Sequence, residues 1–281
     1  MKIGFNLLLW TGFVDDSMLP TIEKIKAAGY DGVELPIFGG AGDPDHYAAM
    51  GKHLDALGLG RTVTTVMPDE QHSCVSPDPA SRAGATEHLK WAVDCSQALG
   101  AEVLMGPFHQ PLGVFTGDGP TDDEKKWCAE VHHEIAEYAQ PKGIKLAMEY
   151  LNRFECYYVT TMAQAAEHVK RVNHPNFGTM YDTFHANIEE ADPIGIIAPN
   201  IGVINHVHIS ENDRGTPGCG HIDFAAAIGA LVKAGYDGWM TIEAFGRALP
   251  ELAAATRVWR DLSPSPDYVF TEGIKVIRDN L

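Results

Sequence analysis

The sequence predicts an α/β protein of the (β/α)8 class, a TIM barrel, in a single domain over residues 1–281. Two observations lead to this prediction. Apolar, β-like runs of about six residues alternate eight times with amphipathic stretches of about 12 to 20 residues, which is the pattern of repeated strand–helix units. The length of 281 residues also fits, because a barrel of this class typically takes about 250 residues.

The first half of the chain is predicted to supply four strand–helix units. The expected strands span residues 2–10, 32–38, 60–67 and 101–106. The expected helices span residues 17–28, 45–57, 80–99 and 121–140. Gly29 and Gly58 follow the first two helices, where glycine readily adopts the left-handed conformation that ends a helix. Thr121 and the three acidic residues after it can cap the fourth helix and complement its dipole.

The second half repeats this plan. Its strands are predicted at residues 144–150, 177–183, 202–210 and 238–244, and its helices near 160–172, 191–199, 223–234 and 249–262. Residues 266–281 are expected to form a C-terminal extension that packs on the outside or bottom of the barrel. The connection at 106–120 is longer than a simple loop needs, so we expect it to act as a substrate lid. No linker-like segment interrupts the pattern, which favours one domain.

The charge balance and the cysteines exclude several classes of function. The 21 Lys and Arg against 38 Asp and Glu give a net charge of −17, so neither nucleic acid nor an anionic membrane is an expected partner. The five cysteines are scattered, with no C-x-x-C pair, so neither a disulfide framework nor a thiolate metal site is predicted. No stretch reaches membrane-spanning length, and the N-terminus lacks a cleavage-site pattern. These features predict an unprocessed, soluble, cytoplasmic protein.

Ligand-type side chains stand at the ends of the last four predicted strands. They are spaced by 33, 26 and 35 residues, about one strand–helix unit each: Glu149, Asp182, His208 and Glu243. Because successive parallel strands end at one rim of a barrel, we expect the four side chains to meet there. Two Glu, one Asp and one His suit a divalent cation such as Mn²⁺, Mg²⁺ or Co²⁺. The alternative, that all four are solvated loop residues or helix caps, requires the same coincidence four times.

Other residues near these strands need separate interpretations. His206 shares a strand face with His208, and His208 is preferred as the ligand because it lies nearer the strand end. His185 is expected in a loop that follows Asp182. Trp10, at the end of the first strand, suits core packing and a pocket wall equally. The histidines on predicted helices are expected at the surface: His88, His132, His133 and His168.

Six runs in the second half carry a more specific signal: EYLNRFE (149–155), DTFHANIEE (182–190), HVHISENDR (206–214), PGCGHIDF (217–224), TIEAFGR (241–247) and VWRDLS (258–263). Together they resemble the ketose 3-epimerases of the D-tagatose 3-epimerase and D-allulose (D-psicose) 3-epimerase type, which are xylose-isomerase-like TIM barrels. By this resemblance the metal ligands fall on the four residues already chosen, and the substrate contacts on Glu155, His185 and Arg214. It also implies one divalent ion per chain, with Mn²⁺ expected first, and a homodimer or homotetramer.

The resemblance implies metal-dependent epimerisation at C3 of free ketoses of the D-tagatose, D-fructose/D-allulose and L-ribulose class. Inversion requires one group to remove the C3 proton and another to return a proton to the opposite face, through an enediolate. Glu149 and Glu243, three strands apart, are the expected pair. His185 and Arg214 are expected near the oxygen where charge develops, and Glu155 near a hydroxyl or His185. No glycine-rich phosphate-binding turn follows the last strands, so free sugars are expected rather than sugar phosphates.

Three other functions remain open at this stage. Another sugar isomerase or a cyclitol dehydratase on the same scaffold is the nearest, although the NRFE run (152–155) speaks against it. A DNA-repair endonuclease would need more histidine ligands and a basic groove. A non-catalytic sugar-binding barrel would not need two carboxylates on opposite sides of a metal. Ala186, Ala244 and the run SENDR (210–214) depart from the family's usual pattern and leave the preferred ketose open.

Overall fold

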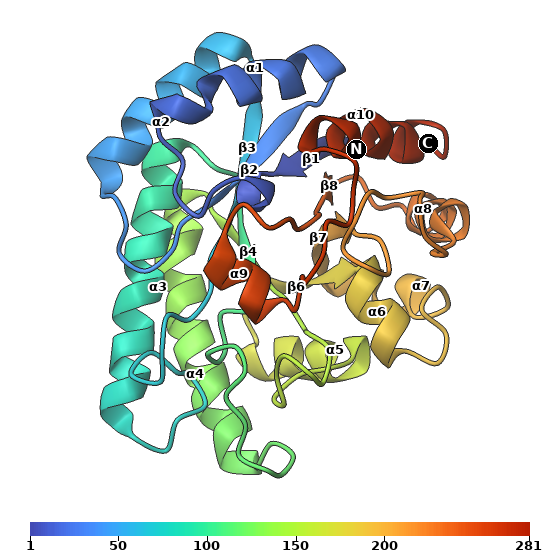
Figure 1. Cartoon of the computed structure of the whole chain (residues 1–281). Helices are drawn as coiled ribbons and strands as arrows, with labels where there is room; N and C mark the ends of the chain where they lie inside the picture. The colour runs from blue at the N-terminus through green and yellow to red at the C-terminus, as the bar shows by residue number, and fades with distance from the viewer.

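The computed structural model describes all 281 residues and forms a closed barrel of eight parallel strands (Figure 1). Each strand pairs with the next in chain order, and β1 closes the ring against β8. The predicted TIM barrel is therefore confirmed. The strands are β1 Lys2–Asn6, β2 Gly32–Pro36, β3 Gly60–Thr64, β4 Val103–Gly106, β5 Lys145–Met148, β6 Phe177–Asp182, β7 Ile204–Ile209 and β8 Trp239–Ile242.

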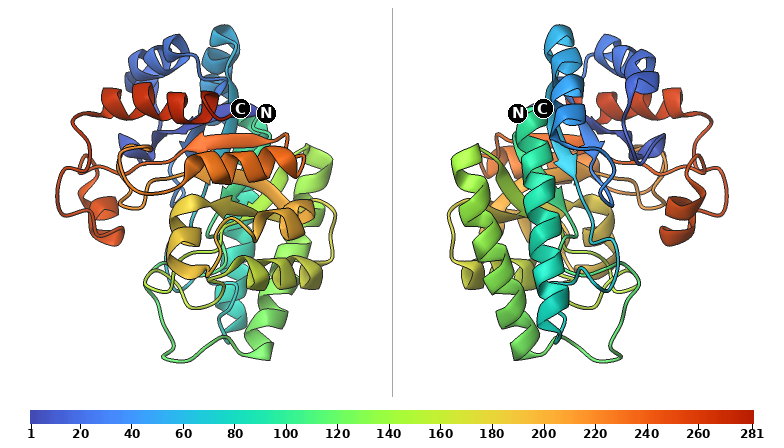
Figure 2. Two further views of the ribbon diagram at one scale, coloured as in Figure 1. Left: turned by 90° about the vertical axis from the view of Figure 1, so that its right-hand side faces the viewer. Right: turned by 90° about the vertical axis from the view of Figure 1, so that its left-hand side faces the viewer.

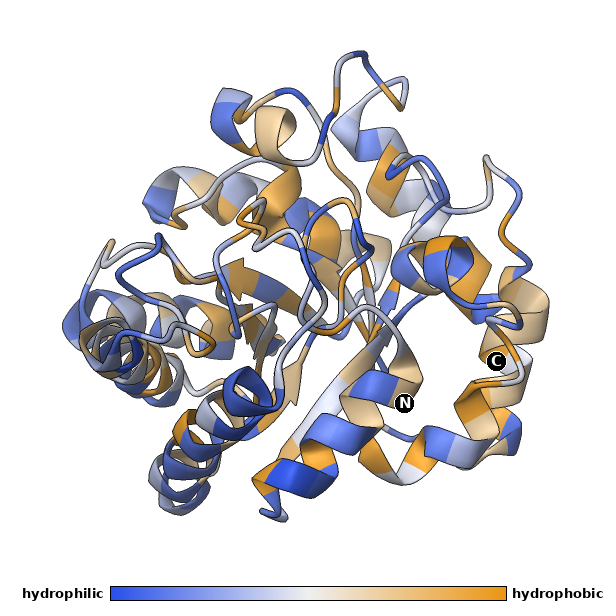
Figure 3. Cartoon of the chain, turned by 90° about the horizontal axis from the view of Figure 1, so that it is seen from below, coloured by the Kyte–Doolittle hydropathy of each residue, from blue (hydrophilic) through white to orange (hydrophobic).

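Helices surround the barrel, and the long helices α3 and α4 run side by side along one flank (Figure 2). Several of these helices carry hydrophobic and hydrophilic residues in alternating patches along their length, as expected for helices with one side on the barrel (Figure 3). None of them combines the length and apolarity needed to cross a lipid bilayer. The helices are α1 Leu19–Ala28, α2 Pro44–Leu57, α3 Pro79–Leu99, α4 Asp122–Ala139, α5 Met162–Val172, α6 Thr183–Glu189, α7 Ile197–Asn200, α8 Phe224–Lys233, α9 Pro250–Ala255 and α10 Pro266–Arg278.

Two apolar layers stabilise the barrel. The larger lies between the strands and the surrounding helices. The smaller fills the barrel interior with side chains from four strands: Val103, Met105, Ala147, Met180 and Trp239. Because side chains of a strand alternate between its two faces, the strand position of Met180 places Asp182 on the same inner face. The interior is therefore apolar at one depth and carries ligand-type side chains at the strand ends.

The structure differs from the predicted elements around the sixth and eighth units. His185 does not lie in a loop, because α6 (Thr183–Glu189) begins directly after β6 and is capped by the Asp182 carboxylate, which accepts a hydrogen bond from the Phe184 amide at 2.6 Å. The helix expected near 191–199 shrinks to the single turn of α7, and the one expected at 249–262 shrinks to α9. The last helix, α10, packs on the outside of the barrel against β1 and β8.

The prediction that the helical histidines lie at the surface is wrong for three of the four. His88, His132 and His168 are 8%, 0% and 3% exposed, and His133 is partly buried. They lie on the barrel-facing sides of their helices, where ring nitrogens find buried partners; the His88 ring, for example, bonds the Val66 carbonyl at 2.9 Å. Trp10 packs on Phe5 and Phe270, so core packing is the better interpretation for it.

Candidate active site

The structure brings together the four side chains predicted to meet at the strand ends. Glu149 follows β5, Asp182 ends β6, His208 lies near the end of β7, and Glu243 follows β8. One ligand atom from each lies within 4.8 Å of the corresponding atoms of the other three, and all four residues are 5% exposed or less. Such a set of convergent, buried oxygen and nitrogen ligands could hold a single divalent cation.

The His208 ring is oriented for a ligand role. Its Nε2 lies 2.7 Å from the Glu34 carboxylate, so we assign the ring proton to Nε2. Its Nδ1 is fully buried without a hydrogen-bond partner, 3.3 Å from Glu243 Oε1 and 3.8 Å from Asp182 Oδ2. A lone pair buried among carboxylates is costly unless a cation satisfies it. The donor set and this unpaired nitrogen therefore fit a bound metal ion.

Glu34 is a residue that the sequence interpretation missed. It lies in the middle of β2, is 0% exposed, and also contacts His206 at 2.9 Å. Asn6 and Thr62 donate further hydrogen bonds to its two oxygens at 2.9 and 2.7 Å. Burial alone would disfavour its charge, but the neighbouring His208 and His206 hold the pKa of Glu34 well below its usual range. A carboxylate inside the otherwise apolar run GVELP is the signal that could have revealed it.

Glu149 lies beside His185, which α6 places under the rim. The His185 Nδ1 accepts a hydrogen bond from the Asn152 amide at 2.9 Å, and its Nε2 lies 3.4 Å from Glu149 Oε1. Asn152 also donates to Glu155 at 2.7 Å, so it links two of the three predicted substrate contacts, His185 and Glu155. Burial raises the pKa of Glu149 above its ordinary value. A raised pKa favours the protonated form, which a proton donor needs.

Arg214 reaches the site from the loop after β7. Its Nη1 donates to Glu243 Oε2 at 2.6 Å and to Asp182 Oδ2 at 3.2 Å. Its guanidinium lies over the Phe184 and Phe245 rings, 3.8 and 4.8 Å from their centroids. The Arg214 backbone adopts a left-handed φ of 66°, an unfavourable state that persists where surrounding contacts hold it. The surrounding contacts thus hold a strained backbone that directs the Arg214 guanidinium at Asp182 and Glu243, two of the four predicted metal ligands.

These residues open into a pocket of about 450 Å³. Glu149, Glu155, Arg214 and Glu243 line it, whereas Asp182, His185 and His208 are buried and do not contribute to its lining. Arg214 is the only Lys or Arg among the lining residues, which also include a fourth carboxylate, Glu251. Much of the remaining wall is apolar and comes from five different connections: Leu8, Phe38, Met67, Pro107 and Phe245. The residues 107, 111 and 112, from the connection predicted to be a lid, also line the pocket.

Comparisons with known proteins show which proteins this chain is similar to. A family model described as the xylose isomerase-like TIM barrel matches residues 22–278. The chain is 31% identical to the ketose 3-epimerase of Arthrobacter globiformis, over 100% of this chain and 97% of that protein. It is 32% identical to the L-ribulose 3-epimerase of Mesorhizobium japonicum, over 93% of this chain and 88% of that protein. Among solved structures, the D-allulose 3-epimerase from Methylomonas sp. in complex with D-allulose has a TM-score of 0.92 and 28% sequence identity. The match covers 100% of this chain and 97% of that chain.

Proposed function

This chain belongs to the ketose 3-epimerase family of xylose isomerase-like TIM barrels, a family of isomerases, and from this premise we propose that it inverts C3 of free ketoses with one bound divalent ion. The substrates expected are of the D-tagatose, D-fructose/D-allulose and L-ribulose class. The observation that carries the proposal is the pair of buried carboxylates, Glu149 and Glu243, which line the pocket from strands on either side of His208 and Asp182.

The residues that would hold the ion are Glu149, Asp182, His208 and Glu243. When bound, a divalent cation would polarise the ketose carbonyl and so make the neighbouring C3 proton more acidic. Mn²⁺ is the ion we expect, with Co²⁺ and Mg²⁺ also suited to this ligand set. Glu34 would support the site by holding His208 with its Nδ1 lone pair directed at the other ligands.

The two glutamates would carry out the proton transfers. In one direction Glu149 or Glu243 removes the C3 proton from one face, and the other glutamate delivers a proton to the opposite face. Each is held by its own partners: His185 lies beside Glu149, while Arg214 and Asn6 donate to the two oxygens of Glu243 at 2.6 and 3.3 Å. Because Glu149 follows β5 and Glu243 follows β8, the two carboxyls can serve opposite faces of the substrate, each acting as the base in one direction and as the acid in the other.

Arg214 and His185 would stabilise the enediolate. The Arg214 Nη2 lies 2.8 Å from the His185 Nε2, so the guanidinium that lines the pocket and the imidazole behind it lie on one side of the pocket. Preorganised donors of this kind act where negative charge develops on the substrate oxygen. Glu155, which Asn152 orients and which lines the pocket, would bind a sugar hydroxyl.

The charges of the pocket support a free sugar as the substrate. Four carboxylates line it, and its single cation, Arg214, already forms ion pairs with Glu243 and Asp182. A phosphate group would find no unpaired lysine or arginine there and would face repulsion from the glutamates. We therefore expect kcat/KM for every tested ketose phosphate to fall below that for the best free ketose, and the reverse order would reject this assignment.

The two-base mechanism is tested by isotope exchange in D₂O. Glu149→Gln and Glu243→Gln should each abolish net epimerisation by several orders of magnitude, but this loss alone is ambiguous because both residues are also proposed ligands. A variant whose metal content has been verified should still exchange the C3 proton of the one epimer that presents it to the surviving glutamate. Comparable exchange of both epimers by one metal-loaded variant would instead mean a single mobile base.

We also propose that the enzyme acts as a homodimer or homotetramer in the cytoplasm. The resemblance to the family supports the oligomer, and five free cysteines, four of them buried, suit a reducing compartment. Light scattering coupled to gel filtration tests the first proposal, and a monomer at micromolar concentration would contradict it.

A further inference from the structure

The short helix α9 lies beside the active-site pocket and away from the body of the barrel. Figure 1 shows α9 in front of the barrel strands, and in both views of Figure 2 the segment that carries it projects from the rest of the molecule. We name residues 246–262 the α9 segment. It forms one wall of the pocket, with five lining residues: Leu249, Glu251, Leu252, Ala255 and Thr256.

Few packing contacts hold α9 in place. The helix spans six residues, and Ala253 is the only one of them that is buried. Ala253 belongs to a small apolar cluster with Leu8, Phe245 and Val258, which is separate from the main core between the strands and the helices. A helix of six residues is not stable by itself, so the position of α9 depends on these few contacts.

The hydrogen bonds of the α9 segment are internal. The Ala253 amide donates to the Leu249 carbonyl at 2.8 Å, and every other hydrogen bond of residues 246–262 also joins two residues of this segment. No side chain caps the start of α9. The segment has one ion pair with the rest of the protein, between the exposed Arg260 and Asp213 at 3.8 Å, and an exposed pair at this distance contributes little.

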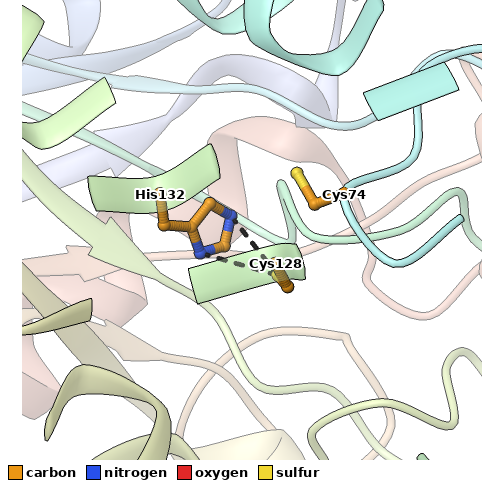
Figure 4. A group of neighbouring side chains, drawn as sticks. All are labelled: Cys74, Cys128 and His132. Carbon is orange, nitrogen blue, oxygen red and sulfur yellow. Dashed lines mark hydrogen bonds between the residues drawn. The ribbon is translucent and has the colours of Figure 1, made fainter. Parts of the chain in front are cut away.

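Another wall of the pocket, which residues 66–68 form after β3, is held much more firmly. The same connection contains Cys74, which is fully buried in the main core and whose amide donates to the His109 carbonyl at 3.0 Å. Figure 4 shows the Cys74 side chain on a loop beside the helix that carries Cys128 and His132. Moving this wall would disrupt the core, whereas moving the α9 segment would not.

We propose that the α9 segment is the lid of the active site, which opens to admit a ketose and closes over it during the reaction. The proposal rests on the proposed function, because it takes the ketose as the occupant of the pocket. Both ends of the lid are fixed. The Phe245 amide donates to the Arg214 carbonyl at 2.9 Å before the segment, and the Thr216 hydroxyl donates to the Ser263 hydroxyl at 2.7 Å after it. Gly246, directly after Phe245, supplies a position where the backbone can rotate.

The lid is coupled to the chemistry through Phe245. The Phe245 ring lies 4.8 Å from the Arg214 guanidinium and packs in the same small cluster as Ala253 and Val258 of the lid. With the lid open, Phe245 loses these partners and water reaches Arg214, which weakens the interaction of Arg214 with a charged substrate oxygen. With the lid closed, the site is shielded from water and the same interaction is stronger. The closed state is therefore the one that reacts.

Fluorine NMR tests the motion directly. Trp259 lies in the lid and is 69% exposed, and it is one of five tryptophans in the chain. The full chain is labelled with 5-fluorotryptophan and loaded with diamagnetic Mg²⁺, and Trp259→Phe assigns the resonance. Without ketose, we expect the Trp259 resonance to show exchange broadening on the microsecond-to-millisecond timescale of lid motions. Saturating D-allulose should suppress this exchange, while the resonance of Trp239 in the barrel interior stays unchanged.

The outcomes separate the lid from the proposed function. A Trp259 resonance without exchange in the ligand-free protein would overturn the lid, and so would exchange that persists with a ketose that the enzyme epimerises. If no ketose is epimerised, the proposed function fails, and the exchange in the ligand-free protein still decides whether the segment moves.

A matched pair of variants links the motion to catalysis. Ala254→Gly alters an exposed position of α9 that does not line the pocket, and glycine weakens a helix. The variant should increase the Trp259 exchange and lower kcat/KM by about two- to fivefold. Ala49→Gly makes the same change at an exposed position of α2 and should leave both unchanged. Wild-type kcat/KM and exchange in Ala254→Gly, or an equal loss in both variants, would refute the lid.

Discussion

Two buried clusters of polar and sulfur-containing side chains in this protein differ in their chemistry and in their access to solvent. At the barrel rim, three carboxylates and His208 surround one point, and two of those carboxylates line a pocket of about 450 Å³. Among the helices, a second cluster, the helical cluster, consists of Cys74, Cys128, His132 and His168, none more than 3% exposed. The first set suits a hard or borderline ion that a substrate can reach, whereas the two imidazoles of the second are hydrogen-bonded to each other at 2.7 Å.

This difference indicates that one cluster serves the reaction and the other serves the stability of the fold. In the cluster at the barrel rim, the His208 Nδ1 has no hydrogen-bond partner. Arg214, which contacts this cluster, has an unfavourable backbone conformation. The helical cluster satisfies its rings with Phe108, Tyr158 and each other. Unsatisfied and strained groups persist where function requires them, whereas a satisfied network rigidifies its surroundings. We therefore expect perturbations of the rim cluster to change activity and perturbations of the helical cluster to change stability.

The largest expected effect is the loss of activity on removal of the rim metal. Treatment with a strong chelator should reduce epimerisation by several orders of magnitude, and Mn²⁺ or Co²⁺ should restore it, because the C3 proton is otherwise too weakly acidic. Asp182→Asn should remain inactive at saturating metal. Glu251→Gln, which alters a pocket-lining carboxylate outside the cluster, provides the control and should keep the same metal requirement. Full activity in a preparation verified as metal-free would contradict this prediction.

Breaking the hydrogen bonds of the helical cluster should come next and should affect stability. His168→Leu leaves the buried His132 Nδ1 without its 2.7 Å partner, which costs roughly 1 to 3 kcal/mol, so Tm should fall by about 2 to 10 °C for a chain of this size. Calorimetry measures this, with Cys156→Ser as a buried control. The requirement for Mn²⁺ should be unchanged. A Tm that falls equally in both variants would remove the distinction between the two clusters.

An intermediate effect is expected from Glu34, which supports the rim cluster without touching the pocket. Glu34→Gln removes the negative charge that orients His208, and changes of such outer partners typically weaken metal binding by about 10- to 100-fold. Activity measured against Mn²⁺ concentration should show this as a shift of the midpoint, with kcat recovered at high metal. Thr62→Val removes only a hydrogen bond to the same carboxylate and should shift the midpoint by far less. Equal midpoints for wild type and Glu34→Gln would mean that the carboxylate does not position His208.

The smallest effect concerns the start of α4, the helix that carries Cys128 and His132. Glu124 completes a capping box with Thr121 and accepts a hydrogen bond from the Tyr157 hydroxyl at 2.5 Å. Burial would raise its pKa, but the Tyr157 and Thr121 donors hold that pKa below the ordinary value. A lowered folded-state pKa stabilises the fold above the unfolded pKa of about 4.3, and this contribution disappears as pH falls through the folded value.

Glu124→Gln should therefore cost about 0.5 to 1 kcal/mol of unfolding free energy at pH 7, and the cost should shrink in acid. Urea denaturation of both proteins at pH 7 and near pH 3 measures the difference. Glu130→Gln, an exposed change on the same helix with only a 3.9 Å contact to Lys126, should have no measurable cost at either pH. A cost for Glu124→Gln that is independent of pH would assign the effect to the lost cap geometry rather than to the charge.

The sequence by itself determined the barrel and the rim cluster. Regular spacing predicted that Glu149, Asp182, His208 and Glu243 end successive strands, and parallel strands of a closed barrel bring their ends to one rim whatever the details of packing. The same regularity could have identified Glu34, because a carboxylate in the middle of an apolar strand must face the interior or solvent. The C-terminal half also carried the runs that resemble the ketose 3-epimerases.

Only the tertiary structure decided the helical cluster and the short elements near the rim. Cys74, Cys128 and His168 are far apart in the sequence and follow no strand spacing, so their scattered positions predicted no site. Likewise, Asp182 ends a strand and also caps α6, which sequence periodicity did not reveal. Strand pairing constrains neighbours through backbone hydrogen bonds that any sequence can form. The face that a helix turns toward the barrel depends instead on the packing of many side chains, which becomes defined only when the whole barrel has closed.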